Sequence, residues 1–168
     1  IYIAVLSQDT EGKMTQQVPQ VLKDNIKTYL NDYRMTNDSL TVQTGKVIDL
    51  RFEVYVTLEK TTNQSAIISD IIDTVSTYLT PLGREMGQNV IISDIRKEVQ
   101  ALKGVVSLSD IKVFNMVGGK YSSSQTAQQY EDVTTKQIKL IDDTIFAQPT
   151  EFYQIRFDNT DVAVRVKQ

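Results

Sequence analysis

The sequence predicts an α+β protein in which helices cover one face of an antiparallel or mixed sheet. The clearest signal runs from residue 48 to residue 59, where every second residue is apolar, as in a strand with one buried face. Two further segments, 18–33 and 65–79, repeat apolar residues at spacings of three and four, which is typical of amphipathic helices. The order strand, helix, strand, strand, helix, helix, strand resembles a ferredoxin-like split β-α-β layer.

The first third of the chain supplies three elements before the long strand. Residues 1–6 form a continuous apolar run, which predicts a strand buried on both faces. A helix of about 17 residues is expected between Val18 and Tyr33, followed by a short strand at 40–44. The strand at 48–59 is longer than this helix, so it either bends at a bulge or has its end covered by another segment.

The middle of the chain predicts two helices and two strands. The helix at 65–79 ends before Pro81, and a short helix follows with Ser93 as its N-cap. Gly104 stands where a C-terminal cap belongs, and strands are expected at 105–108 and 111–117.

Beyond residue 117 the sequence changes character. Residues 118–137 are polar with almost no aliphatic side chains, which predicts a long binding loop or a mobile connection. Residues 138–168 predict a small β unit, so the expected division is an α+β domain at 1–117, a polar loop and this unit. Its expected strands, with a hairpin-like turn at 158–161, are 144–147, 152–157 and 162–166.

The composition restricts the chemistry. The chain has neither Cys nor His, which excludes Ser-His-Asp and Cys-His catalysis, disulfides, and zinc sites built from those residues. A net charge of −3 argues against nucleic acid as a partner, and no apolar run approaches the roughly 20 residues that span a bilayer.

Two local patterns resemble parts of reactive sites. Gly118-Gly119-Lys120 lacks the earlier Gly and the following Ser or Thr of a phosphate-binding P-loop, so it is read as a turn. The acidic pairs 131–132 and 142–143 lack further converging carboxylates and are read as solvated charges. We therefore predict no catalytic, cofactor-binding or metal-binding residue, no cofactor and no small-molecule substrate.

Candidate contact residues lie at two places. Arg51, Glu53 and Tyr55 fall on the polar face of the long strand, and an exposed aromatic residue beside Arg is enriched at protein interfaces. An ordinary solvent-exposed face explains these three residues equally well. The polar loop adds Lys120, Tyr121 and Tyr130, and this loop could become ordered only when a partner binds.

The first 117 residues carry a pattern of structural residues seen in one known family. It resembles the baseplate J-like proteins of contractile-tailed phages, and within them the carboxy-terminal part of the wedge proteins of the T4 type. The segments that carry the resemblance are 1–6, 30–34, the strand at 47–58, Tyr78-Leu79, the spaced set Gly87, Val90, Ser93 and Ile95, and Gly104-Val105.

The resemblance implies a structural component of the virion tail baseplate, assembled in the host cytoplasm. Its partners would be other copies of itself and other wedge proteins, joined in a ring that rearranges when the sheath contracts. The family carries no enzymatic activity or cofactor. The start at Ile1, inside a predicted strand, further suggests a piece of a longer protein.

Two other classes of protein stay open on the sequence. Ferredoxin-like layers bind small molecules in several unrelated families, so a regulatory ligand-binding module is the first alternative. A carboxylate-based hydrolase is the second, and it would require two facing acidic side chains within about 10 Å in a cleft.

Overall fold

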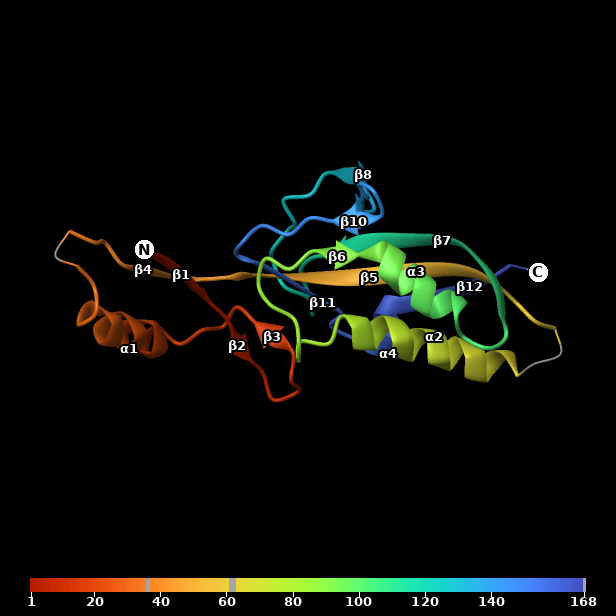
Figure 1. The fold of residues 1–168 in the computed structure, drawn as a ribbon, viewed down its shortest axis with the longest axis horizontal. Helices are drawn as coiled ribbons and strands as arrows, with labels where there is room; N and C mark the ends of the chain where they lie inside the picture. Colours follow the sequence, from red (N-terminus) through yellow and green to blue (C-terminus); the bar gives the residue numbers. More distant parts are fainter. Residues whose placement is uncertain (36, 61–62, 168) are drawn as a thin grey trace.

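The computed structural model describes residues 1–35, 37–60 and 63–167 as a mixed α+β protein (Figure 1). Gln168, the last residue of the predicted β unit, lies outside the described residues. The molecule is long in one direction, with α1 (Gln20–Asn31) near one end and the C-terminus at the other.

The main sheet is built around β5 (Lys46–Leu58). On one edge, this strand pairs antiparallel with β7 (Val105–Met116). Its other edge carries two short parallel strands in succession, β11 (Glu151–Gln154) and β12 (Val162–Val166). Beyond β7 the sheet continues through β9 (Gln137–Ile138) and β8 (Tyr130–Asp132).

The core forms where the apolar face of β5 meets two helices, α2 (Gln64–Tyr78) and α3 (Ile92–Gln100). Phe52, Val54 and Val56 have no exposed surface, which confirms the predicted alternation along this strand. The register between β5 and β7 shifts after Tyr55 and again after Thr57, and each time β7 carries the extra residue of the bulge. Among the described residues, no helix has the length and apolar character needed to cross a bilayer.

The first strand does not join this sheet. β1 (Tyr2–Val5) pairs in parallel with β4 (Thr41–Thr44), and α1 packs on β4. We call β1, α1, β4, Ile1 and residues 32–35 the arm. The prediction that residues 1–6 are buried on both faces is wrong, because among the described strands β1 pairs with β4 alone and Tyr2 is 80% exposed.

A small hairpin fastens the arm's connection to the body of the protein. It consists of β2 (Ser7–Gln8) and β3 (Met14–Thr15). The backbone N–H of Met14 donates to Gln154 Oε1 at 2.8 Å, and Arg156 Nη1 donates to Asp9 Oδ2 at 2.6 Å. The hairpin is thus bonded to the region of β11.

The C-terminal residues belong to the main sheet instead of forming a separate β unit, since β11 and β12 both pair with β5. The predicted hairpin-like turn at 158–161 is wrong. These residues form a short helix, α4 (Asp158–Asp161), in which Asp161 Oδ2 accepts the backbone N–H of Phe157 at 2.9 Å. β11 and β12 both run parallel to β5 along the same edge, so the chain between them keeps its direction. A helical turn suits this connection, whereas a hairpin turn would reverse the chain.

The short helix α3 also begins differently from expectation. β6 (Val90–Ile91) pairs with β10 (Thr144–Ile145) and runs directly into α3, so Ile91 is the N-cap and Ser93 lies inside the helix. The backbone N–H of Ile92 is satisfied by the carbonyl of Asp143 at 2.7 Å, which replaces a side-chain cap.

Candidate functional site

The three predicted contact residues on β5 form one connected group. Arg51 Nη2 lies 3.2 Å from Glu53 Oε1, and the Tyr55 hydroxyl donates to Glu53 Oε2 at 3.0 Å. This hydrogen bond raises the pKa of the Tyr55 phenol, since it favours the protonated form. The carboxylate of Glu53 is thus held between Arg51 and Tyr55, and its side chain is only 16% exposed.

Neighbouring strands add cations around this group. Arg165 Nη2, from β12, lies 3.7 Å from Glu53 Oε1. Lys112 Nζ and Lys167 Nζ lie 5.6 and 5.9 Å from the centre of the Tyr55 ring, within cation–π range. We call the whole group the sheet-face patch; its members are Arg51, Glu53, Tyr55, Lys112, Arg165 and Lys167.

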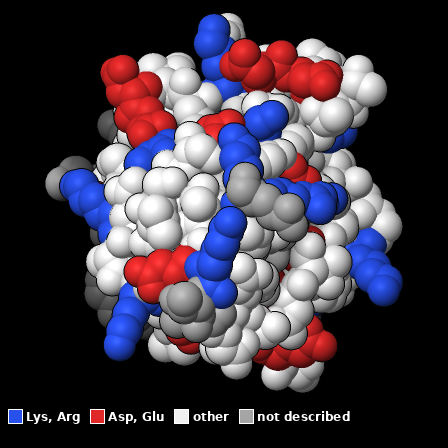
Figure 2. All heavy atoms as spheres, turned by 90° about the vertical axis from the view of Figure 1, so that its right-hand side faces the viewer, with Lys and Arg blue, Asp and Glu red and all other residues white. Residues whose placement is uncertain are grey.

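The sheet-face patch has four cations and one carboxylate in a chain whose net charge is −3. The end of the molecule that faces the viewer in Figure 2 carries charges of both signs between uncharged residues. Such a mixed surface differs from the extended basic field that phosphate backbones attract. The sheet-face patch contains Arg and Tyr, residue types that are enriched where proteins contact one another.

Tyr121 lies on the same side of the sheet but is bonded within the chain. Its hydroxyl donates to Asp161 Oδ1 at 2.6 Å, and its ring packs edge-on against Phe157 at 5.6 Å. Burial, together with this hydrogen bond, raises the pKa of Tyr121 to about 12. Burial also raises the pKa of Asp161, which has no exposed surface. Tyr121 therefore serves the protein's own structure.

Of the other two predicted loop residues, Tyr130 lies on the opposite face of the sheet from the sheet-face patch. The Tyr130 hydroxyl donates to Asn115 Oδ1 at 2.9 Å, and its ring packs on the apolar core, which is on the opposite face of the sheet. Lys120 is exposed and lines a cavity. The structure thus brings Arg51, Glu53 and Tyr55 together and leaves Tyr130 elsewhere.

The polar loop at 118–137 is anchored to the sheet within the isolated chain. The backbone N–H groups of Ser122 and Thr126 donate to Asp49 Oδ2 at 2.7 Å and Asn115 Oδ1 at 2.8 Å. The backbone N–H of Ala127 donates to Glu151 Oε1 at 2.9 Å. The loop is therefore held in place by buried side chains without needing a partner.

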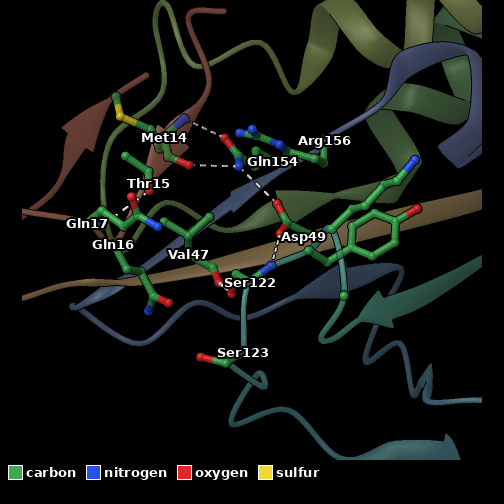
Figure 3. Close-up of a pocket in the computed structure, with 13 residues that line it drawn as sticks. Met14, Thr15, Gln16, Gln17, Val47, Asp49, Ser122, Ser123, Gln154 and Arg156 are labelled. Atoms are coloured by element: carbon green, nitrogen blue, oxygen red, sulfur yellow. Dashed lines mark hydrogen bonds between the residues drawn. The ribbon is translucent and has the colours of Figure 1, made fainter. Parts of the chain in front are cut away.

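A polar cavity of about 460 Å³ opens beside this loop (Figure 3). Among the described residues Asp49 is its one lining carboxylate, and both oxygens are in use, accepting from Ser122 N–H and from Gln154 Nε2 at 2.9 Å. The lining residues are Met14, Thr15, Gln16, Gln17, Val47, Asp49, Gly119, Lys120, Tyr121, Ser122, Ser123, Gln154 and Arg156.

The chemistry of this lining favours binding over bond-making. A carboxylate-based hydrolase needs a pair of facing acids, and the lining has one. Over the described ranges there is also no group of three or more Asp and Glu side chains that could hold a metal ion. Amides, hydroxyls and the two cations of Lys120 and Arg156 would suit a small polar molecule.

A second buried polar group lies where the loop meets β11. Glu151 has no exposed surface, and its carboxylate accepts from Gln148 N–H at 3.0 Å and from the Tyr153 hydroxyl at 3.1 Å, besides Ala127 N–H. The Tyr153 hydroxyl also bonds Thr126 Oγ1. Glu151, Tyr153 and Thr126 thus form a hydrogen-bonded network that fixes the loop and has a structural role.

One feature of the arm was not predicted from the sequence. Thirteen large hydrophobic side chains are exposed among the described residues, and seven of them lie in residues 1–35. α1 has no fully buried residue. The apolar stripe of this helix is visible in the sequence, but its packing on the short strand β4 could not be predicted from it. The seven are Ile1, Tyr2, Val21, Leu22, Tyr29, Tyr33 and Met35.

No protein-family model matches the chain, and comparison with curated proteins found no similar one. The function is therefore inferred from the residues and contacts of the chain itself.

Proposed function

We propose that this chain is a non-catalytic structural subunit that acts by binding other protein subunits. The observation that carries the proposal is the exposed apolar surface of the arm. Tyr29, on a helix that buries none of its residues fully, is 65% exposed, and Tyr33, in the turn after that helix, is 72% exposed. Exposed apolar surface gathered in one region marks an interaction site, since single scattered residues would be ordinary.

The sheet-face patch supports the same proposal from another side of the molecule. Arg and Tyr are the residue types most enriched at binding hot spots, and here both are held in place by Glu53 before any partner arrives. An element that joins others into a ring or chain needs at least two contact surfaces. The arm and the patch would supply them.

The resemblance to baseplate J-like proteins gives this proposal a biological setting. We propose that the chain is a piece of a contractile-tail baseplate wedge protein of the T4 type, located in the virion. Its partners would be further copies of itself and other wedge proteins. The absence of Cys and His agrees with a role that needs no reactive side chain.

The ferredoxin-like split β-α-β layout remains part of the proposal. The order of α2 and α3 between β5 and β7 supports it, with both helices contributing to one core. The pairing of β1 with β4, outside the main sheet, departs from that layout.

Sedimentation velocity over a rising series of protein concentrations tests the proposal. We expect the mean mass to rise above the 19.0 kDa of one chain. A chain that stays monomeric at the highest concentration would contradict a role in assembly.

The polar cavity favours one alternative, a module that binds a small polar molecule. Its volume of about 460 Å³ lies within the range of ligand pockets. A thermal-shift screen with small polar metabolites separates the two functions. Saturable stabilisation by one compound, abolished by Arg156→Ala, would favour the binding module, while a flat response would leave assembly as the better explanation.

A further inference from the structure

The surface left open on α1 follows from how the helix sits on its own strands. Leu22, Ile26 and Tyr29 are spaced by four and three residues and so share one side of α1, and Tyr33 follows in the turn just beyond the helix. Ile26 is half-buried, but Leu22, Tyr29 and Tyr33 are 43%, 65% and 72% exposed. One side of the apolar stripe of α1 therefore packs against the strands of the arm, and the other side is uncovered.

Contacts within the arm fix which side of α1 is covered. Lys23 Nζ donates to Thr44 Oγ1 at 3.0 Å, so this flank of the helix faces β4. The rings of Tyr29 and Tyr33 lie 5.2 Å apart and form one aromatic surface away from it. Val21 and Met35, which are 69% and 79% exposed, lie near the two ends of the helix.

The size of this surface matches one side of a homodimer interface. Each partner of a standard interface buries about 800 Å², of which roughly 500 Å² is apolar in homodimers. At 65% and 72% exposure, Tyr29 and Tyr33 alone contribute roughly 270 Å² of it. Val21, Leu22 and Met35 supply apolar surface for the remainder.

The charges around the stripe allow two copies of the helix to approach. The segment 20–35, which holds all five exposed side chains of this surface, contains three cations and two carboxylates, Lys23, Lys27, Arg34, Asp24 and Asp32, so its net charge is only +1. A second copy therefore meets only weak like-charge repulsion, and an apolar stripe is complementary to itself under two-fold symmetry. A strongly charged partner would find no opposite field here.

The backbone of the arm also has an open side. β1 pairs only with β4 among the described strands, which leaves N–H and C=O groups on its other edge. Such edges recruit further strands or approaching chains. An approaching second arm would meet both the α1 stripe and this edge.

We infer that the arm is a two-fold dimerisation element, in which α1 packs against α1 of a second copy of this chain. This inference rests on the proposed assembly function and names the partner and the surface. It separates the roles of the two surfaces, because the sheet-face patch stays free in the dimer to bind a further subunit.

Sedimentation of the whole chain and two matched variants tests this dimer. Tyr29→Glu places a charge in the apolar stripe, and Val106→Glu makes the same kind of change at a 61% exposed site on β7. We expect Tyr29→Glu to raise the dimer dissociation constant at least about tenfold, with Val106→Glu close to the unchanged chain. Far-UV circular dichroism checks that both variants are folded.

Because the chain has no native Cys, a single introduced Cys can serve as an independent cross-linking probe of the dimer. Asn25→Cys, on an exposed turn of α1, should cross-link to a second copy through a short bis-maleimide, whereas Val106→Cys should not. If the chain associates but Tyr29→Glu has no more effect than Val106→Glu, the arm is the wrong surface and the assembly function stands. A chain that is monomeric throughout overturns both.

Discussion

At the scale of single residues, three buried carboxylates decide where the chain runs after β7. Asp49, Glu151 and Asp161 are at most 1% exposed, and each accepts hydrogen bonds from residues of the polar loop. A buried carboxylate without such donors would be costly, so the loop and the carboxylates stabilise each other. These residues are thus structural, and the groups left for partners are those outside this network.

Replacing Tyr121 with Phe should destabilise the protein in a pH-dependent way. Burial raises the pKa of Asp161 in the folded state, while the Tyr121 hydroxyl opposes that rise. At a pH below the unfolded value of about 3.9, Asp161 is protonated in both states and the substitution costs little. As pH rises through the folded pKa the carboxylate ionises with one donor missing, so the cost should grow to about 1–3 kcal/mol.

Urea unfolding at several pH values measures this effect. Tyr33→Phe is the control, because the Tyr33 side chain is 72% exposed. An equal loss of stability at pH 3 and pH 7 for Tyr121→Phe would show that the ionised Asp161 does not depend on this hydroxyl.

At the scale of elements, the sequence predicted those with strong periodicity and missed those defined by distant partners. α2 and β5 were predicted because each has enough residues to show its period of 3.6 or 2. The parallel pairing of β11 and β12 with β5 was not, because strands of four and five residues show no partner preference. Arg51, Glu53 and Tyr55 were placed together because residues two apart share a strand face, whereas Tyr130 reached the other face through a loop.

The face of β5 makes a prediction at this scale. Replacing Arg51 and Tyr55 together with Ala should lower association beyond the dimer, since both side chains leave the sheet-face patch. It should also destabilise the fold by about 1–2 kcal/mol, because Glu53, with only 16% of its side chain exposed, loses its two hydrogen-bond partners and keeps the longer contact to Arg165 at 3.7 Å.

Adding Glu53→Gln to the double variant separates these effects. The amide removes the stranded charge, so part of the stability should return while association stays weak. Sedimentation and thermal unfolding of both variants measure the two quantities. Unchanged association beyond the dimer would mean that another face of the sheet makes the contact.

At the scale of the whole molecule, the arm and the main sheet differ in what supports them. β5 is paired on both edges and buries one face against two helices, whereas β1 and β4 form a two-stranded sheet at one end (Figure 1). Two strands with a partly covered helix are marginally stable in water. The arm should therefore depend on a partner for stability in a way that the main sheet does not.

Amide hydrogen exchange over a concentration series tests this dependence. In dilute protein, α1 and β1 should exchange far faster than β5 and β7, because local opening of the arm breaks few buried contacts. As dimers form, exchange in the arm should slow while exchange in β5 stays constant, since binding stabilises only the state that the partner contacts. In Tyr29→Glu the arm should remain fast at every concentration. Slow exchange of α1 in dilute wild-type protein would show that the arm is stable alone, and its open apolar stripe would then need a different explanation.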